Sequence, residues 1–322
     1  MTYSKESLKI VFFGTPDFAV ESLSRLVEGG YNIVGVVTMP DKEAGRGHKL
    51  LQSPVKQYAL EHGLRLLQPE RLKNPQFVEE LRSLQADLQI VIAFRMLPEV
   101  VWAMPPLGTF NLHASLLPKY RGAAPINWAV INGETETGVT TFFLKHEIDT
   151  GDIIQQRKID IADNDNVGIV HDRLMTMGAD MVIETVDAII TGTVKPIPQD
   201  QLCNAGTEPT PAPKIFKETC HICWNRPACD VRNLVRGLSP YPAAWTEITD
   251  AAGTTHTAKV FEVSLATDAE TTGHRPGDMW NDGTGRLLAM CNDTAVEITQ
   301  LQLAGKRRMS AADFLRGFHL KA

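Results

Sequence analysis

The sequence predicts two domains of different fold class. An α/β domain with an open, mostly parallel sheet flanked by helices is followed by a small antiparallel OB-like β-barrel. The chain of 322 residues is longer than one hydrophobic core usually supports. Strand and helix signals alternate over the first ~200 residues, whereas short strand-like runs separated by turn residues fill the rest. The stretch NAGTEPTPAP at 204–213 is a linker signal. We expect a first domain at 1–203 and a second at 214–322.

Apolar runs locate the strands of the first domain, because a parallel strand covered on both faces is continuously apolar. Residues 8–14 (LKIVFFG), 31–38 (YNIVGVVT) and 88–94 (LQIVIAF) are such runs. Two further strands are expected at 137–145 and 151–161.

Helices between these strands are predicted from a polar residue followed by proline. The pairs are Thr15-Pro16, Ser53-Pro54 and Asn74-Pro75. A side-chain oxygen can accept a bond from a free N–H at the helix start, and proline gives up an N–H that would lack a partner there.

A long helix is expected at 167–190, after the last strand of the first domain. Apolar residues recur there in steps of three and four, which places them on one helix face. They are Val167, Val170, Leu174, Met177 and Met181.

Strand-like segments separated by Gly-, Asp- and Asn-rich turns follow the linker, which favours a small barrel. They are residues 243–248, 257–264, 286–290 and 295–303.

Charge and composition are typical of a globular protein, and they limit the partners. The net charge is −6. Residues 1–206 carry 19 Lys+Arg against 25 Asp+Glu, and the remaining 32 − 19 = 13 basic residues balance 38 − 25 = 13 acidic ones. Neither part is basic, so contact with RNA would need local patches. No apolar run reaches the ~18 residues of a membrane span, the start does not resemble a signal peptide, and five cysteines do not suggest a disulfide framework. We expect a cytoplasmic protein.

The segment GTFNLHASLLPKYRGAAP at 108–125 carries the candidate chemistry. Asn111 and His113 are two apart on an expected strand, so their side chains leave the same face near its carboxyl end, where ligands of open sheets bind. Asp149 follows the next strand and could reach the same edge of the sheet, which we call the rim. An amide can stabilise a developing oxyanion, and an imidazole can move a proton. A nearby carboxylate can fix the orientation of the imidazole. Alternatively, Asn111 and His113 satisfy loop backbone groups and Asp149 caps a turn.

Two motifs resemble those of the folate-dependent formyltransferases, and the similarity to that family extends over nearly the whole chain. The first is NLHASLLPKYRGAAP from Asn111, and the second is DTGD from Asp149. The resemblance implies that Asn111, His113 and Asp149 are the catalytic residues and that 10-formyltetrahydrofolate is the formyl donor, with no metal. It also implies a Rossmann-like catalytic domain.

The same resemblance implies a binding site for the folate. Ser115, Leu116, Leu117 and Pro118 would contact it. Phe94, Met96 and Leu97 would help to form the pterin pocket, although AFRMLP departs here from the tyrosine-glycine pair of many members.

Further segments resemble the members of this family that formylate initiator methionyl-tRNA for translation initiation. They are KIVFFGTPDFAV at the start, the loop at 39–50 with Arg46 between two glycines, and the segment 212–224. The resemblance implies that the second domain binds the tRNA. The cations expected to do so are Arg46, Lys214, Lys217, Arg232, Arg236, Lys306, Arg307 and Arg308. Each could instead be an ordinary exposed charge. We expect a monomer, since the tRNA needs access to both domains.

Other readings fit less well. Gly14-Thr15-Pro16 lacks the glycine pattern of a dinucleotide site. Cys220 and Cys223, with Cys229 nearby, could suggest zinc, but a fourth ligand is not obvious. No GxSxG elbow surrounds Ser115, which argues against a hydrolase triad. Three rivals remain open: a sugar-nucleotide N-formyltransferase, a formyl-folate hydrolase and a non-catalytic RNA-binding protein.

Overall fold

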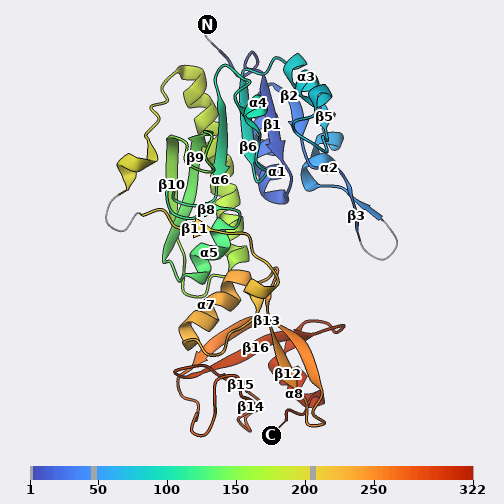
Figure 1. Ribbon diagram of the computed structural model, residues 1–322, viewed down its shortest axis with the longest axis vertical. Coiled ribbons are helices and arrows are strands. Elements are labelled where there is room, and N and C mark those ends of the chain that lie inside the picture. Colours follow the sequence, from blue (N-terminus) through green and yellow to red (C-terminus); the bar gives the residue numbers. More distant parts are fainter. Residues whose placement is uncertain (1–2, 45–48, 204–207, 322) are drawn as a thin grey trace. The chain divides into compact units, whose positions relative to one another are not determined.

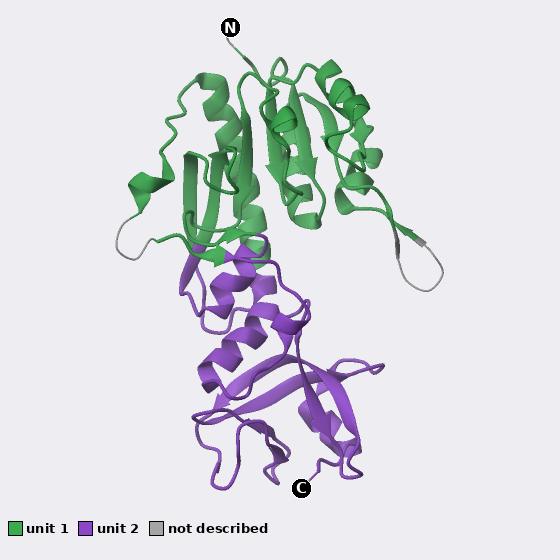
Figure 2. Ribbon diagram, in the orientation of Figure 1, with its two compact units in different colours: residues 1–122, 138–159, 171–211 green, residues 123–137, 160–170, 212–322 purple. Residues whose placement is uncertain are grey.

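The computed structural model describes residues 3–44, 49–203 and 208–321. Figure 1 shows the course of the chain, which divides into two compact units (Figure 2). The first comprises residues 1–122, 138–159 and 171–211, and the second comprises residues 123–137, 160–170 and 212–322. The chain therefore passes between the units several times. The domain boundaries expected at residues 203 and 214 concern parts of the chain that would fold separately. They stay a prediction.

A seven-stranded sheet forms the centre of the first unit, in the order β10-β9-β7-β6-β1-β2-β5. Strands β5, β2, β1, β6 and β7 run parallel, and β9 pairs antiparallel with β7. All five residues of β1 and of β6 are buried, as expected for parallel strands covered by helices on both faces. The strands are β1 (Ile10–Gly14), β2 (Ile33–Val37), β5 (Leu66–Leu67), β6 (Leu88–Ile92), β7 (Thr109–His113), β9 (Glu136–Phe143) and β10 (Ile153–Asp160).

The helices beside this sheet are α1 (Asp17–Glu28), α2 (Pro54–Glu61), α3 (Pro75–Ser83), α4 (Glu99–Trp102) and α6 (Val167–Thr191). The caps predicted at Ser53 and Asn74 are confirmed, because their side chains accept the backbone N–H groups of Lys56 and Gln76. The cap predicted at Thr15 is wrong. Helix α1 starts one residue later, with Pro16 at its N-cap, and the Thr15 hydroxyl has no hydrogen-bond partner among the described residues.

Helix α6 packs tightly behind the strand that carries the candidate chemistry. A Cβ atom on Gly178 would lie only 2.8 Å from a methyl group of Leu112 in β7, so the absence of a side chain permits this approach. Val170, Leu174 and Met181 are buried, which confirms the apolar face predicted for this helix. The backbone of β7 is thus held between two neighbouring strands and a helix.

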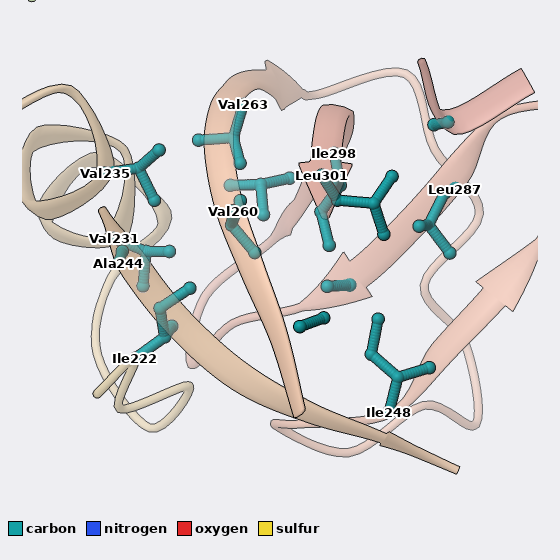
Figure 3. Close-up of a cluster of buried hydrophobic side chains, with 14 of the residues drawn as sticks. Ile222, Val231, Val235, Ala244, Ile248, Val260, Val263, Leu287, Ile298 and Leu301 are labelled. Carbon is teal, nitrogen blue, oxygen red and sulfur yellow. The ribbon is translucent and has the colours of Figure 1, made fainter. Parts of the chain in front are cut away.

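A curved antiparallel sheet, or half-barrel, forms the second unit. Its order is β12-β13-β16-β15-β14, with β17 paired to β16, and β13 is bent by a register shift between Val260 and Val263. Its buried apolar side chains, among them Ile248, Val260 and Leu301, form one cluster with Val231 and Val235 of α7 (Figure 3). The elements are β12 (Ala244–Thr249), β13 (Thr255–Ala266), β14 (Met279–Asn281), β15 (Leu287–Met290), β16 (Ala295–Leu303), β17 (Met309–Ser310), α5 (Pro125–Ile131), α7 (Ala228–Leu238) and α8 (Ala311–Gly317).

Several short elements complete the chain. Strands β3 (Lys42–Ala44) and β4 (Lys49–Leu51) form an antiparallel ladder after β2. Single turns of 3-10 helix occur at η1 (Gln199–Leu202) and η2 (Glu218–Cys220), and two-residue strands occur at β8 (Arg121–Gly122) and β11 (Pro211–Ala212).

Candidate active site

Strand β7 presents the first two candidate residues at its carboxyl end. Val91 and Phe142 lie opposite Asn111 in the flanking strands, and Thr140 lies opposite His113. Asn111 is half-buried, and its amide forms no hydrogen bond within the described ranges 3–44, 49–203 and 208–321. An amide left without a protein partner at this rim is available to a ligand.

His113 is held in a closed environment, with 7% of its surface exposed. Its Nε2 lies 2.8 Å from the backbone oxygen of Tyr120. Because a carbonyl only accepts hydrogen bonds, Nε2 carries the proton in this arrangement. The other nitrogen, Nδ1, lies 4.0 Å from Oδ2 of Asp149. The Tyr120 carbonyl therefore fixes the ring, and the carboxylate acts on it through its charge.

Asp149 reaches this rim from the turn between β9 and β10. Its Oδ2 accepts the backbone N–H of Gly122 at 2.9 Å. Its φ of +54° is in the left-handed region, which aspartate adopts more readily than most residues with a Cβ atom. The turn thus aims one carboxylate oxygen at both the Gly122 amide and the His113 ring.

The segment predicted to contact the folate, Ser115, Leu116, Leu117 and Pro118, follows β7 directly and is anchored by buried groups. The Thr140 hydroxyl donates to the Ser115 carbonyl at 2.6 Å and accepts the Leu117 N–H at 3.2 Å. Gln156 donates to the Leu117 carbonyl at 2.7 Å. The side chains of Ser115 and Leu117 are buried, so this segment offers mainly its backbone and the half-buried Leu116 to a ligand.

The residues predicted for the pterin pocket differ in their surroundings. Phe94 is half-buried and packs edge-on against Phe13, with ring centroids 5.7 Å apart. Leu97 is buried in the core beside the sheet, whereas Met96 is 72% exposed. Arg95, the residue between Phe94 and Met96, donates to the carbonyl oxygens of Pro69 and Glu70. Of the three, Phe94 is the half-buried aromatic residue.

The predicted RNA-binding cations do not form one uniform group. Arg46 lies outside the described residues. Lys214, Lys217, Lys306, Arg307 and Arg308 are exposed. Three arginines make contacts within the second unit. Arg308 donates from Nε to Oε1 of Gln300 at 2.7 Å. Arg232 grips Asp163 with bonds of 2.9 and 2.7 Å, and Arg236 donates to the Asp165 carbonyl at 3.1 Å.

The pKa values of this arginine cluster agree with such contacts. The Arg232 guanidinium holds the pKa of Asp163 below its usual range, mainly through their hydrogen bonds. Burial lowers the pKa of Arg236. Arg232 and Arg236 therefore serve the internal packing of α7 in this structure.

Aromatic rings accompany the exposed lysines, a feature that the charge count alone did not indicate. Phe216 is 58% exposed, with the Lys214 ammonium 5.7 Å from its ring centroid. The Lys217 ammonium lies 5.5 Å from the ring of Trp245, and Lys259 faces that tryptophan from the neighbouring strand. We call this set the lysine–aromatic face: Lys214, Phe216, Lys217, His221, Trp245 and Lys259.

Sequence reasoning missed the residues that support the rim. Thr140, Gln156 and Gln199 all act through hydrogen bonds to backbone groups of other segments. None belongs to a motif with a fixed spacing, so no local signal identified them.

The described residues contain neither a metal-binding cluster nor a membrane-spanning helix. Within ranges 3–44, 49–203 and 208–321, no group of three or more His, Cys, Asp or Glu side chains is arranged to hold a metal ion. No helix in that part of the chain is long and apolar enough to cross a membrane. Cys220 and Cys291 are buried thiols, and Cys203, Cys223 and Cys229 are exposed ones.

Comparison with known proteins gives the family to which this fold belongs. The family described as "Formyl transferase" matches residues 8–186, and "Formyl transferase, C-terminal domain" matches residues 214–319. Fold, site and both matches together define a formyl transferase.

Close relatives specify the family further. The methionyl-tRNA formyltransferase of Bacteroides fragilis is 63% identical over 98% of this chain and 97% of the relative. That of Parabacteroides distasonis is 60% identical, with the same coverage of both chains. The chain belongs to the methionyl-tRNA formyltransferase family.

Two solved structures of low identity share the fold. HypX from Aquifex aeolicus, in complex with tetrahydrofolic acid, has a TM-score of 0.61 at 19% identity, over 95% of this chain and 46% of that one. An N-formyltransferase from Helicobacter canadensis, with folinic acid and dTDP-3-aminofucose, has a TM-score of 0.64 at 19% identity, over 90% of this chain and 98% of that one. These similarities confirm the predicted fold class of an α/β sheet domain followed by an antiparallel β domain, and the predicted OB-like barrel is a half-barrel in the structure.

Proposed function

We propose that this enzyme transfers the formyl group of 10-formyltetrahydrofolate to the α-amino group of methionine on initiator tRNA. The observation that carries the proposal is the approach of Asp149 to within 4.0 Å of His113 at the carboxyl end of β7, the strand that also carries Asn111. The chain is 60–63% identical to methionyl-tRNA formyltransferases. We further propose that it works as a monomer in the cytoplasm, where initiator tRNA is used.

The proposed reaction is direct attack of the amine on the formyl carbon. A new C–N bond forms to the methionine nitrogen, the bond from the formyl carbon to N10 of the folate breaks, and the proton lost by the amine ends on N10. Asn111, whose amide has no protein partner in the described part of the chain, donates to the oxygen that becomes negative.

His113 and Asp149 serve proton movement in this proposal. The Tyr120 carbonyl holds the proton on Nε2, which leaves Nδ1 as the nitrogen that accepts or returns a proton. Asp149, 4.0 Å from Nδ1, stabilises the imidazole when it becomes positive. No covalent enzyme intermediate is required.

We propose that the folate lies along 115–118 and Phe94. The backbone of Ser115, Leu116, Leu117 and Pro118 offers polar groups fixed by Thr140 and Gln156, and the Phe94 ring offers a flat apolar surface. Met96 and Leu97 then flank this pocket, Met96 from solvent and Leu97 from the core.

The lysine–aromatic face is the part of the second unit that best suits tRNA. Lysines neutralise backbone phosphates, and exposed rings stack on unpaired bases. Lys214 and Lys217 belong to this face, whereas Lys306, Arg307 and Arg308 lie in the turn after β16 and would contribute separately. Because Arg232 and Arg236 are held within the unit, we rank them below the lysines as RNA ligands.

Acceptor preference tests the proposed function. Purified enzyme is given 10-formyltetrahydrofolate with methionyl-initiator tRNA, with an amino-sugar nucleotide, or with no acceptor. We expect transfer to the tRNA alone. Transfer to the sugar would support the first rival, formate release without acceptor would support a hydrolase, and tRNA binding without turnover would support a non-catalytic protein.

A further inference from the structure

Gln199 is a buried amide whose hydrogen bonds all go to the segments around Asp149 and His113. Its side chain is 3% exposed. Nε2 donates to the carbonyl oxygens of Asp149 and Gly151 at 2.8 and 2.9 Å. Oε1 accepts from Nη2 and Nε of Arg121 at 2.6 and 3.2 Å. An amide has two N–H donors and two acceptor positions, so this one is fully used, and the carbonyl partners determine which atom is nitrogen.

The backbone beside Gln199 is fixed independently of its side chain. Ile197 exchanges two backbone hydrogen bonds with Ile153 at the start of β10, at 2.8 and 2.9 Å. This bridge brings the start of η1 alongside the turn that precedes β10. Gln199 is therefore presented to residues 149–151 by a short, rigid connection.

The turn that carries Asp149 needs such support. Asp149 has a φ of +54°, which residues with a Cβ atom rarely adopt. Gly151 passes so close to β9 that a Cβ atom there would lie 1.5 Å from the Phe143 carbonyl oxygen. The carbonyls on both sides of Thr150 point to the same Gln199 nitrogen, which holds the turn in this conformation.

Arg121 connects the other side of Gln199 to the same two catalytic candidates. The carbonyl of the residue before it, Tyr120, accepts a hydrogen bond from Nε2 of His113. The backbone N–H of the residue after it, Gly122, donates to the Asp149 carboxylate. Gln199 thus joins residues 120–122 to residues 149–151. Both segments contact His113 or Asp149 directly.

We propose that Gln199 is a positioning residue for the transfer reaction. It sets the distance between the Asp149 carboxylate and the His113 ring by holding the backbone of residues 149–151 and the side chain of Arg121, and it touches neither substrate. The inference rests on the function proposed for His113 and Asp149.

Two substitutions separate positioning from general folding. Gln199→Met keeps the side-chain volume and removes all four hydrogen bonds. Gln199→Glu keeps the acceptors for Arg121 but loses both donors and sets a carboxylate against two carbonyl oxygens. We expect kcat to fall roughly 10- to 100-fold in both, with KM for tRNA and for folate changed by less than about 3-fold, since misplacement of a catalytic group by 1 Å can cost that much. Gln201→Met is the control, because Gln201 is exposed in the same turn.

A double-mutant cycle with Asp149→Asn then asks whether Gln199 acts through Asp149. The second substitution should add little to the loss caused by the first, because residues that act as a unit are non-additive. Multiplying losses, or a kcat of Gln199→Glu equal to that of wild type, would overturn the inference. Should Gln199→Met fail to fold, Gln199→Glu carries the test. An inactive wild type in the same assay would count against the proposed function instead.

Discussion

The rim of the first unit and the lysine–aromatic face of the second are built on opposite principles. At the rim, polar groups are buried and each holds another: His113 bonds to Tyr120, Asp149 to Gly122, and Gln199 to both turns around them. On the face, Lys214 and Lys217 are exposed, and their neighbours are the rings of Phe216 and Trp245.

This difference matches the demands of the two proposed tasks. Catalysis gains from groups that are already in place and need no reorganisation when charge develops. Binding a long, charged and hydrated RNA gains from accessible cations that replace counterions. Substitutions at the rim should therefore change the rate of transfer, and substitutions on the face should change affinity and its dependence on salt.

The largest effect is expected at Asn111. Asn111→Ala removes the amide donor proposed for the oxyanion, so kcat should fall by about 10²–10³-fold. Steady-state transfer to methionyl-initiator tRNA measures it, and Asn292→Ala, an exposed asparagine of the second unit, is the control. Near-native turnover by Asn111→Ala would remove Asn111 from the mechanism.

The rim could be predicted from the sequence only as far as local patterns reach. The spacing of Asn111 and His113 on an apolar strand already implied a common face, and the DTGD motif pointed to Asp149. The bond from His113 to the Tyr120 carbonyl was not predictable, because a backbone acceptor leaves no trace in residue identity. Gln199 lies 50 residues beyond Asp149, and the Ile153–Ile197 bridge helps to bring it near.

A smaller effect on folate binding is expected at Thr140. Thr140→Val keeps the shape and loses the bonds to the Ser115 carbonyl and the Leu117 N–H, so KM for the folate should rise roughly 5- to 30-fold, corresponding to about 1–2 kcal/mol. Thr141→Val is a matched control, because its hydroxyl bonds to Thr185 of α6 instead. Equal changes in KM for both variants would indicate a general loss of stability.

The salt dependence of tRNA binding tests the lysine–aromatic face in the same comparison. The double variant Lys214→Ala/Lys217→Ala should lower the slope of log affinity against log salt by about 1–2, since each phosphate contact contributes ~0.9. Its kcat at saturating tRNA should stay that of wild type. Filter binding over a salt series measures the slope, with the exposed Lys195→Ala of the first unit as control. An unchanged slope would exclude these lysines as phosphate contacts.

The lysines of the lysine–aromatic face could be predicted from the sequence, but their surroundings could not. Lysine is recognised from sequence as a charge, but its value as an RNA ligand depends on whether an acid already neutralises it. From the sequence, Arg232 and Lys217 were equivalent candidates for RNA binding. In the structure, Arg232 forms hydrogen bonds with Asp163, which lies 69 residues earlier in the chain. The sequence analysis assigned no role to Phe216 or Trp245, and their association with lysines is visible only in three dimensions.

The smallest effect concerns the stability of the first unit. Hydrogen bonds from Lys56 and Gln68 hold the pKa of Asp41 below its usual range. A carboxyl group with a lowered folded-state pKa stabilises the fold above its unfolded pKa of about 3.9 and loses that contribution as pH falls further. Asp41→Asn should therefore lower Tm at pH 7 and approach the wild-type Tm below about pH 4. A difference in Tm that does not vary with pH would contradict this assignment.

The most direct test of the account is a single-turnover measurement on His113→Ala with enzyme in excess over methionyl-initiator tRNA. The same preparation gives the rate of formyl transfer and, by titration, the affinity for the tRNA. We expect the rate to fall by about 10²–10⁴-fold, the usual contribution of a positioned acid–base group, and the tRNA affinity to stay unchanged. A near-native rate, or a loss confined to tRNA affinity, would contradict the assignment of the chemistry to this rim.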